Sequence, residues 1–183
     1  MADYRESRRL RGVIHLYTGE GKGKTTAAVG LVVRAAGRGV PVTFAQFMKG
    51  NDTGELYVLN KLPEVTICRS EKNFGFYRSM TEEQKAELTT IHNRILDTLL
   101  IRARKGAGRM IVLDEITYPV NWGLVDVDKL GELLALGKKE LEIVLTGRDA
   151  APLLQDAADY ITEMQAVRHP YERGVMARVG IEF

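Results

Sequence analysis

The sequence predicts an α/β fold in three layers, in which helices cover both faces of a mostly parallel central sheet. Two observations support this prediction. Short apolar runs of strand length alternate along the chain with longer segments of helical periodicity. A glycine-rich loop at 18–26 also joins the first apolar run directly to a helix-forming segment, as in a βαβ unit. Ligands of such folds bind where the parallel strands end, so we expect the chemistry at the carboxyl edge of the sheet.

The first half of the chain supplies one βαβ unit. Residues 13–17 form an apolar run that stops at the glycine-rich loop, which predicts a short buried strand. The segment 25–37 is rich in Ala and Val and ends in a glycine turn, so we expect a helix there. Apolar residues at 42–47 and 65–68 predict the next strands, and the polar segment 49–54 is expected to be a loop.

The second half continues the alternation of helices and strands. Thr81 and Gln84 have the spacing of a capping box and predict the start of a long helix that ends near residue 105. Its apolar residues recur on one face, as expected for a helix packed on a sheet. The remaining expected elements are strands at 110–113, 143–146 and 160–164, an edge strand within 174–183, and helices at 126–136 and 152–158, the last with Pro152 in its first turn.

Composition limits the classes of function. The chain has 183 residues, of which 45% are hydrophobic and 27% charged, so we expect one domain with one core over residues 1–183. The formal net charge of +2 is too balanced to indicate a nucleic-acid partner, and residues 1–11 are expected to form a flexible basic arm. A single cysteine excludes a disulfide framework, and no stretch has the form of a membrane span or a signal peptide, so the expected location is the cytoplasm.

The glycine-rich loop predicts a site for a nucleoside triphosphate. Its glycines let successive backbone N–H groups approach an anion, and the helix that follows adds its positive N-terminal end. Lys24 is expected to bind the terminal phosphates, and the Thr25 hydroxyl to coordinate a phosphate-bound Mg²⁺. The usual pattern has glycine where this chain has Thr18, so either Thr18 takes that corner or the loop begins at Gly19. The residues expected to contact the nucleotide are Thr18, Gly19, Glu20, Gly21, Lys22, Gly23, Lys24, Thr25 and Thr26.

An acidic pair, Asp114 and Glu115, directly follows the apolar run 110–113. Carboxylates at the end of a buried strand are the expected partners of a phosphate-binding loop, because they hold Mg²⁺ directly or through water. The spacing does not decide which of the two contacts the metal. Arg148 follows the strand at 143–146 and is either a further cation for the triphosphate or a surface residue. Three reactions remain open: γ-phosphoryl transfer, hydrolysis, and attack at C5′ of the ribose.

The chain carries five sequence blocks: 17–28 (YTGEGKGKTTAA), 46–50 (QFMKG), 112–118 (VLDEITY), 145–148 (LTGR) and 179–183 (VGIEF). In this order and spacing they resemble the P-loop class of ATP:corrinoid adenosyltransferases, over nearly the full length of the chain. The family also lacks the first glycine of the usual phosphate loop. The resemblance implies a fold like that of the P-loop NTPases. It also implies a reaction in which the Co(I) centre of a reduced corrinoid attacks C5′ of ATP and triphosphate is released.

The resemblance implies roles for particular residues at the phosphate end of ATP. Lys24, Thr25 and Glu115 would act in catalysis by stabilising the leaving triphosphate, with Arg148 as a further contact. Mg²⁺ would be held by Thr25 and by Asp114 or Glu115. The main alternative is a P-loop kinase or ATPase that cleaves at the γ-phosphate.

At the corrinoid end, the resemblance implies a role for two aromatic residues, Phe74 and Phe76, where a relative would carry Phe and Trp. They would fill the lower face of the corrinoid and exclude its axial ligand. Trp122 is either another corrinoid contact or a packing residue. A homodimer and an electron donor such as a flavoprotein reductase are also implied, while the corrinoid could be a complete cobalamin or a precursor.

Overall fold

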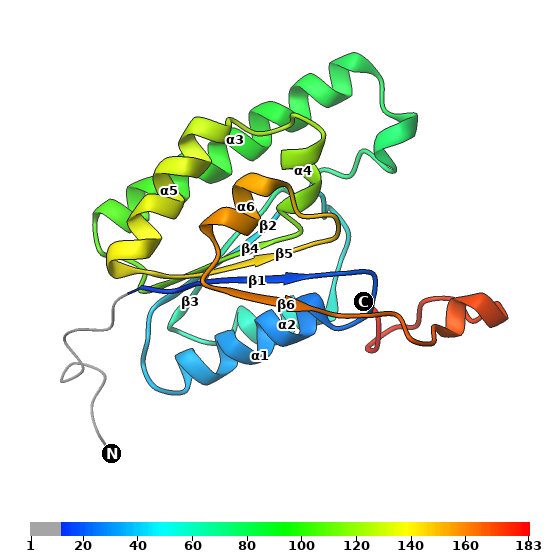
Figure 1. Ribbon diagram of the computed structural model, residues 1–183, viewed down its shortest axis with the longest axis horizontal. Coiled ribbons are helices and arrows are strands. Elements are labelled where there is room, and N and C mark those ends of the chain that lie inside the picture. Colours follow the sequence, from blue (N-terminus) through cyan, green and yellow to red (C-terminus); the bar gives the residue numbers. More distant parts are fainter. Residues whose placement is uncertain (1–11) are drawn as a thin grey trace.

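The computed structural model describes residues 12–183 and has the three predicted layers (Figure 1). Its strands are β1 (Ile14–Thr18), β2 (Val42–Gln46), β3 (Val65–Cys68), β4 (Met110–Asp114), β5 (Glu142–Thr146) and β6 (Tyr160–Glu163). In the described part of the chain the strands lie in the order β3-β2-β4-β5-β1-β6, and each neighbouring pair is parallel. The predicted parallel sheet is therefore confirmed, whereas the predicted arm at 1–11 lies outside the described residues.

The helices cover both faces of this sheet. They are α1 (Lys24–Ala36), α2 (Gly54–Leu59), α3 (Glu82–Arg104), α4 (Thr117–Asn121), α5 (Val127–Glu140) and α6 (Pro152–Ala157), with short 3₁₀ turns at Tyr77–Ser79 and Pro170–Arg173. Figure 1 shows α3 and α5 on one face and α1 on the other. None of the helices that the structure describes is long and apolar enough to cross a membrane.

Alternate residues of each central strand pack against different helices. Ile111 and Leu113 of β4 are fully buried with residues of α3 and α5, whereas Val112 is buried with residues of α1. Burial of one such side chain contributes about 1.5–3 kcal/mol to folding. A strand covered on both faces therefore has an uninterrupted apolar sequence, which is the pattern that predicts β4 and β5.

The predicted edge strand within 174–183 is wrong, because this segment consists of turns at 174 and 179–182 joined by residues without regular structure. Gly180 has a φ of 74°, and the backbone N–H groups of Ile181 and Glu182 both donate to the carbonyl of Arg178. The Glu182 carboxylate also accepts hydrogen bonds from the Arg178 backbone and guanidinium. These local contacts replace the hydrogen bonds that a strand would make with β6.

The short helices α2 and α4 were not predicted from the sequence. They have six and five residues, and fewer than two turns show no apolar periodicity. Both follow a strand at the carboxyl edge of the sheet, so they form part of the rim of the candidate site.

His92 is a buried polar residue of α3 with an exposed fraction of 1%. Its ring lies against Phe47, with the ring centroids 5.4 Å apart. Nε2 of His92 accepts a hydrogen bond from the backbone N–H of Met48, at 3.4 Å, so Nδ1 carries the proton and faces the carbonyl of Leu124 at 3.3 Å. Burial lowers the pKa of His92 from 6.5 to about 4, and the hydrogen bond to Leu124 opposes part of this shift.

The low pKa of His92 predicts a loss of stability in mild acid. Between pH 6.5 and about 4 the unfolded chain binds a proton at this histidine while the folded chain does not. Lowering the pH from 7 to 5 should therefore reduce the free energy of unfolding by about 2 kcal/mol, measured by urea denaturation. His92→Gln should lack this part of the pH dependence, whereas His169→Gln should keep it. An equal loss in wild type and His92→Gln would contradict the assignment.

Candidate active site

The glycine-rich loop lies between β1 and α1, at the carboxyl edge of the sheet (Figure 1). Thr18 is the last residue of β1 and pairs with Glu163 of β6, so the loop begins at Gly19. Gly19 has a φ of 93° and Gly23 a φ of 114°, which are left-handed conformations that favour glycine. Gly23 is also the N-cap of α1, so the loop turns directly into the positive end of a helix.

Lys24 directs its ammonium group back into this loop. Its Nζ donates to the carbonyls of Gly19 and Gly21, at 2.6 Å each, and the residue is 9% exposed. Burial lowers the pKa of Lys24, and the positive charge of Arg148 lowers it further. Arg148 pairs with Glu20 of the loop, with Nη1 and Oε2 3.1 Å apart. The structure thus brings the predicted cations Lys24 and Arg148 to the loop, a surrounding that favours a bound anion.

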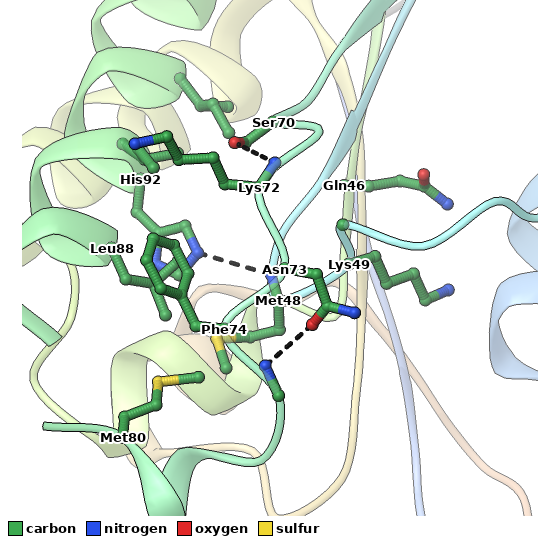
Figure 2. A pocket seen from close by; sticks show the side chains of 14 residues that line it. Gln46, Met48, Lys49, Ser70, Lys72, Asn73, Phe74, Met80, Leu88 and His92 are labelled. Carbon is green, nitrogen blue, oxygen red and sulfur yellow. Dashed lines mark hydrogen bonds between the residues drawn. The ribbon is translucent and has the colours of Figure 1, made fainter. Parts of the chain in front are cut away.

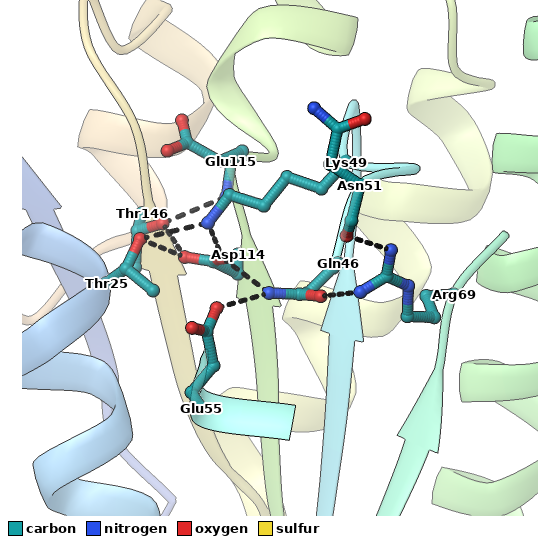
Figure 3. Close-up of polar contacts among 9 residues, drawn as sticks. All are labelled: Thr25, Gln46, Lys49, Asn51, Glu55, Arg69, Asp114, Glu115 and Thr146. Atoms are coloured by element: carbon teal, nitrogen blue, oxygen red, sulfur yellow. Dashed lines mark hydrogen bonds and ion pairs between the residues drawn. The ribbon is translucent and has the colours of Figure 1, made fainter. Parts of the chain in front are cut away.

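Asp114, at the end of β4, is fully buried and connects several elements through its carboxylate (Figure 3). Its Oδ1 accepts hydrogen bonds from the hydroxyls of Thr25, at 2.8 Å, and Thr146, at 2.7 Å. Its Oδ2 contacts Nζ of Lys49 at 2.7 Å and Nε2 of Gln46 at 3.5 Å. Since β5 lies between β1 and β4, Thr146 at the end of β5 lies between the phosphate loop and the acidic pair.

Glu115 follows Asp114 with a φ of 62°, an unusual conformation for a residue other than glycine. Its backbone N–H donates to the hydroxyl of Thr146 at 2.9 Å. Among the described residues, no donor reaches its buried Oε2 atom. Burial raises the pKa of Glu115, and the negative charge of Asp114 adds to the shift. An unpaired buried carboxylate oxygen of this kind is an expected ligand for a cation.

These residues fit a magnesium ion. The hydroxyl of Thr25 and the carboxylates of Asp114 and Glu115 supply the oxygen ligands that Mg²⁺ prefers. Residues 12–183 contain no group of three or more His, Cys, Asp or Glu side chains placed to hold a metal by themselves. Mg²⁺ in proteins is commonly bound by one or two carboxylates together with substrate phosphates, so this donor set suits an ion that binds together with a triphosphate.

Comparison with known proteins is consistent with this geometry. The family model described as ATP:corrinoid adenosyltransferase BtuR/CobO/CobP matches residues 10–183. The chain belongs to this family. A corrinoid adenosyltransferase of Pseudomonas aeruginosa is 31% identical over 97% of this chain and 87% of its own length. Another, named CobA, from Salmonella typhimurium is 32% identical over 94% of this chain and 86% of its own length.

Two residues at the candidate site were not predicted from the sequence. Lys49 and Thr146 both contact Asp114, yet no role was predicted for either. Both lie in sequence blocks that carry the family resemblance, 46–50 and 145–148, which is the signal that could have identified them. Burial alone would lower the pKa of Lys49, but the charge of Asp114 and the hydrogen bond to it raise the pKa above its usual value. The lysine is therefore charged.

The two predicted corrinoid residues lie in different surroundings. Phe74 is half-buried and packs on an apolar cluster that contains Met80, Leu88 and Leu124. Figure 2 shows it in a pocket beside Met48 and His92, lined by 14 residues. The cavity volume of this pocket is about 20 Å³, room for about one water molecule.

Phe76, in contrast, is 87% exposed. Trp122 packs face to face on Tyr77, with the ring centroids 4.3 Å apart. The structure therefore supports the packing role that was considered for Trp122, and leaves Phe76 as an aromatic side chain open to solvent.

The C-terminal segment lies against the phosphate loop. The backbone N–H of Gly21 donates to the carbonyl of Met164 at 2.5 Å, and Nζ of Lys22 donates to Oε1 of Glu182 at 3.1 Å. Hydrogen bonds from Arg178 hold the pKa of Glu182 at about 2, so this carboxylate is ionised. Lys22, predicted as a nucleotide contact, thus pairs with Glu182 near the loop, while Lys24 lies inside it.

Thr146 should stabilise the folded protein through its hydroxyl. Thr146→Val removes the hydrogen bond to Asp114 and leaves the Glu115 N–H without its acceptor, which should cost about 2–3 kcal/mol of unfolding free energy. Thr146→Ser keeps the hydroxyl and loses one methyl group, which should cost about 1 kcal/mol. Urea denaturation of both variants measures the difference. A Thr146→Val variant as stable as the wild type would show that the hydroxyl contributes nothing.

Proposed function

We propose that this protein transfers the 5′-deoxyadenosyl group of ATP to the Co(I) centre of a reduced corrinoid and releases triphosphate. Membership of the adenosyltransferase family is the observation that carries the proposal. The site is consistent with it, since a phosphate loop, a buried acidic residue and several cations meet at one edge of the sheet. The product belongs to the synthesis or salvage of adenosylcobalamin.

In this reaction the cobalt–carbon bond forms as the bond between C5′ and the triphosphate oxygen breaks, and the electron pair leaves with the triphosphate. The reduced corrinoid is itself the nucleophile, so no general base or nucleophilic side chain is needed. The chain has two tasks, to place C5′ in line with cobalt and to stabilise a highly anionic leaving group. Lys24, Arg148 and the N–H groups at the start of α1 suit the second task.

Thr25, Asp114 and Glu115 would hold the magnesium ion, which neutralises part of the triphosphate charge when bound. Of the two carboxylates, Asp114 already bonds to the Thr25 hydroxyl, whereas Glu115 keeps a free buried oxygen. Because their only task is to stabilise the leaving triphosphate, Lys24, Thr25 and Glu115 would act in catalysis through their charge and polarity and not as acids or bases.

We propose Phe74 and Phe76 as the residues that contact the lower face of the corrinoid. The exposure of Phe76 supports this assignment, because a large aromatic side chain in solvent is suited to cover an apolar ligand. Phe74 would anchor the segment, since it packs on the cluster around Leu88.

The proposed partners are a second copy of this chain and an electron donor such as a flavoprotein reductase. Exposed apolar side chains on the edge strand β6, Tyr160 and Ile161, offer surface for a protein partner. A single domain over 1–183, a location in the cytoplasm and the absence of a nucleic-acid partner stay predictions.

The direct test is to incubate the protein with MgATP and chemically reduced cobalamin and to follow the absorption spectrum. The proposal predicts a light-sensitive product with a cobalt–carbon bond. Consumption of ATP without such a product would overturn it and favour a P-loop kinase or ATPase.

Lys24→Ala should reduce turnover at least about a hundredfold, because it removes the cation inside the phosphate loop. Lys22→Ala is the matched control and should lose less than about tenfold, since Lys22 pairs with Glu182. Initial rates with Co(I) cobalamin measure both. A small effect of Lys24→Ala would remove the loop from the proposed mechanism.

Phe76→Ala should fold like the wild type, because the side chain is exposed, yet lower the rate from Co(II) corrinoid and reductant about tenfold more than the rate from pre-reduced Co(I). Phe74→Ala should lower both the rate and the unfolding free energy, by about 2–3 kcal/mol for the half-buried ring. Equal losses from Co(II) and Co(I) in Phe76→Ala would argue against displacement of the axial ligand.

A further inference from the structure

Lys49 lies where a cation of the triphosphate site would act. Its side chain extends from the loop after β2 toward α1 (Figure 3). Nζ is 2.7 Å from Oδ2 of Asp114 and 3.4 Å from Oγ1 of Thr25. These are two of the three groups that suit a magnesium ion. The Lys49 ammonium therefore already makes the contacts with Asp114 and Thr25 that a bound magnesium ion would also need.

The backbone fixes this position of Lys49. Met48, the preceding residue, has a φ of 58°, which is uncommon for a residue other than glycine. Such a conformation persists only when the surrounding structure imposes it. Here the Met48 N–H donates to the buried ring of His92, which belongs to α3. The turn before Lys49 is thus tied to the core.

The Lys49–Asp114 pair also differs from a surface ion pair. Asp114 is fully buried and Lys49 has a side-chain exposure of 23%, so separating them without replacement would leave a carboxylate without its main counter-charge. Lysine has a flexible stem and a compact charge, which let its ammonium change partners over a few ångströms without movement of the backbone.

We propose that Lys49 is an exchangeable counter-cation. In the nucleotide-free protein it neutralises Asp114, and when the metal arrives with the triphosphate it leaves Asp114 and binds the triphosphate. The proposal rests on the proposed function only in that the site binds a magnesium triphosphate. Two cations at one carboxylate repel each other, so Lys49 opposes binding of a free metal ion. The triphosphate supplies the new partner that lets the lysine move, and the metal and nucleotide therefore bind as a unit.

The test is the affinity of the nucleotide-free protein for Mn²⁺ alone, measured by electron paramagnetic resonance. Lys49→Met should bind Mn²⁺ about tenfold more tightly than the wild type, because the competing charge is gone. The same variant should bind MgATP about tenfold more weakly, measured by calorimetry, because a phosphate contact is lost.

Lys49→Arg keeps the charge and should keep the weak Mn²⁺ binding. Lys72→Met removes a lysine that pairs with Glu87 and should change neither affinity by more than about twofold.

Opposite changes in the two affinities distinguish exchange from a fixed structural pair, whose loss would weaken both. Unchanged or weaker Mn²⁺ binding by Lys49→Met would overturn the proposal. Lys49→Gln, which keeps a hydrogen-bond donor, serves if Lys49→Met does not fold. A crystal structure of the wild type with MgATP gives an independent answer: a phosphate contact of Lys49 supports exchange, and a retained contact with Asp114 contradicts it. None of these measurements uses a corrinoid. A failure of the proposed adenosyl transfer would therefore leave their outcome unchanged and can be distinguished from a failure of the exchange at Lys49.

Discussion

The site depends on one buried charge, the carboxylate of Asp114. It accepts hydrogen bonds from Thr25 and Thr146 and pairs with Lys49, so it joins helix α1, the loop after β2 and the end of β5 to its own strand β4. A buried carboxylate is tolerated only when such partners satisfy it. The requirement works in both directions: the folded sheet supplies the partners, and the carboxylate fixes where the threonine hydroxyls and the lysine ammonium point.

The fold brings these groups together through strand order. The phosphate loop follows β1 and the acidic pair lies at the end of β4, and β5 separates these two strands in the sheet. Parallel pairing places all three carboxyl ends at one edge, where α1 also begins. A site assembled this way gathers cations and carboxylates at one edge of the sheet. That property suits a reaction in which the protein stabilises a leaving group while the substrates supply the nucleophile and the electrophile.

The features that the sequence predicted well are those that depend on residues adjacent in the chain. The loop at 18–26 and the pair Asp114–Glu115 combine a strand end with side chains beside it, and the buried strands have continuous apolar sequences. No role was predicted for Lys49 because its partner Asp114 is 65 residues away in the sequence. The sequence around neither residue shows that the two meet in the folded protein. The strand predicted within 174–183 was wrong because apolar residues and a glycine turn are compatible both with a strand and with a C-terminal segment that folds back in turns. Phe74 and Phe76 are separated by one residue, yet only the structure shows that one is packed and the other exposed.

In the proposed reaction, the residues around Lys24 and Asp114 bind the triphosphate as a leaving group and do not break it. Phosphorus-31 NMR of the products, after reaction of the wild-type protein with MgATP and Co(I) cobalamin, tests this directly. The proposed reaction should give intact inorganic triphosphate in an amount equal to the ATP consumed, with its three phosphorus atoms still connected. ADP with phosphate as the initial products would contradict it, because the bond broken would then lie between phosphates and not at C5′.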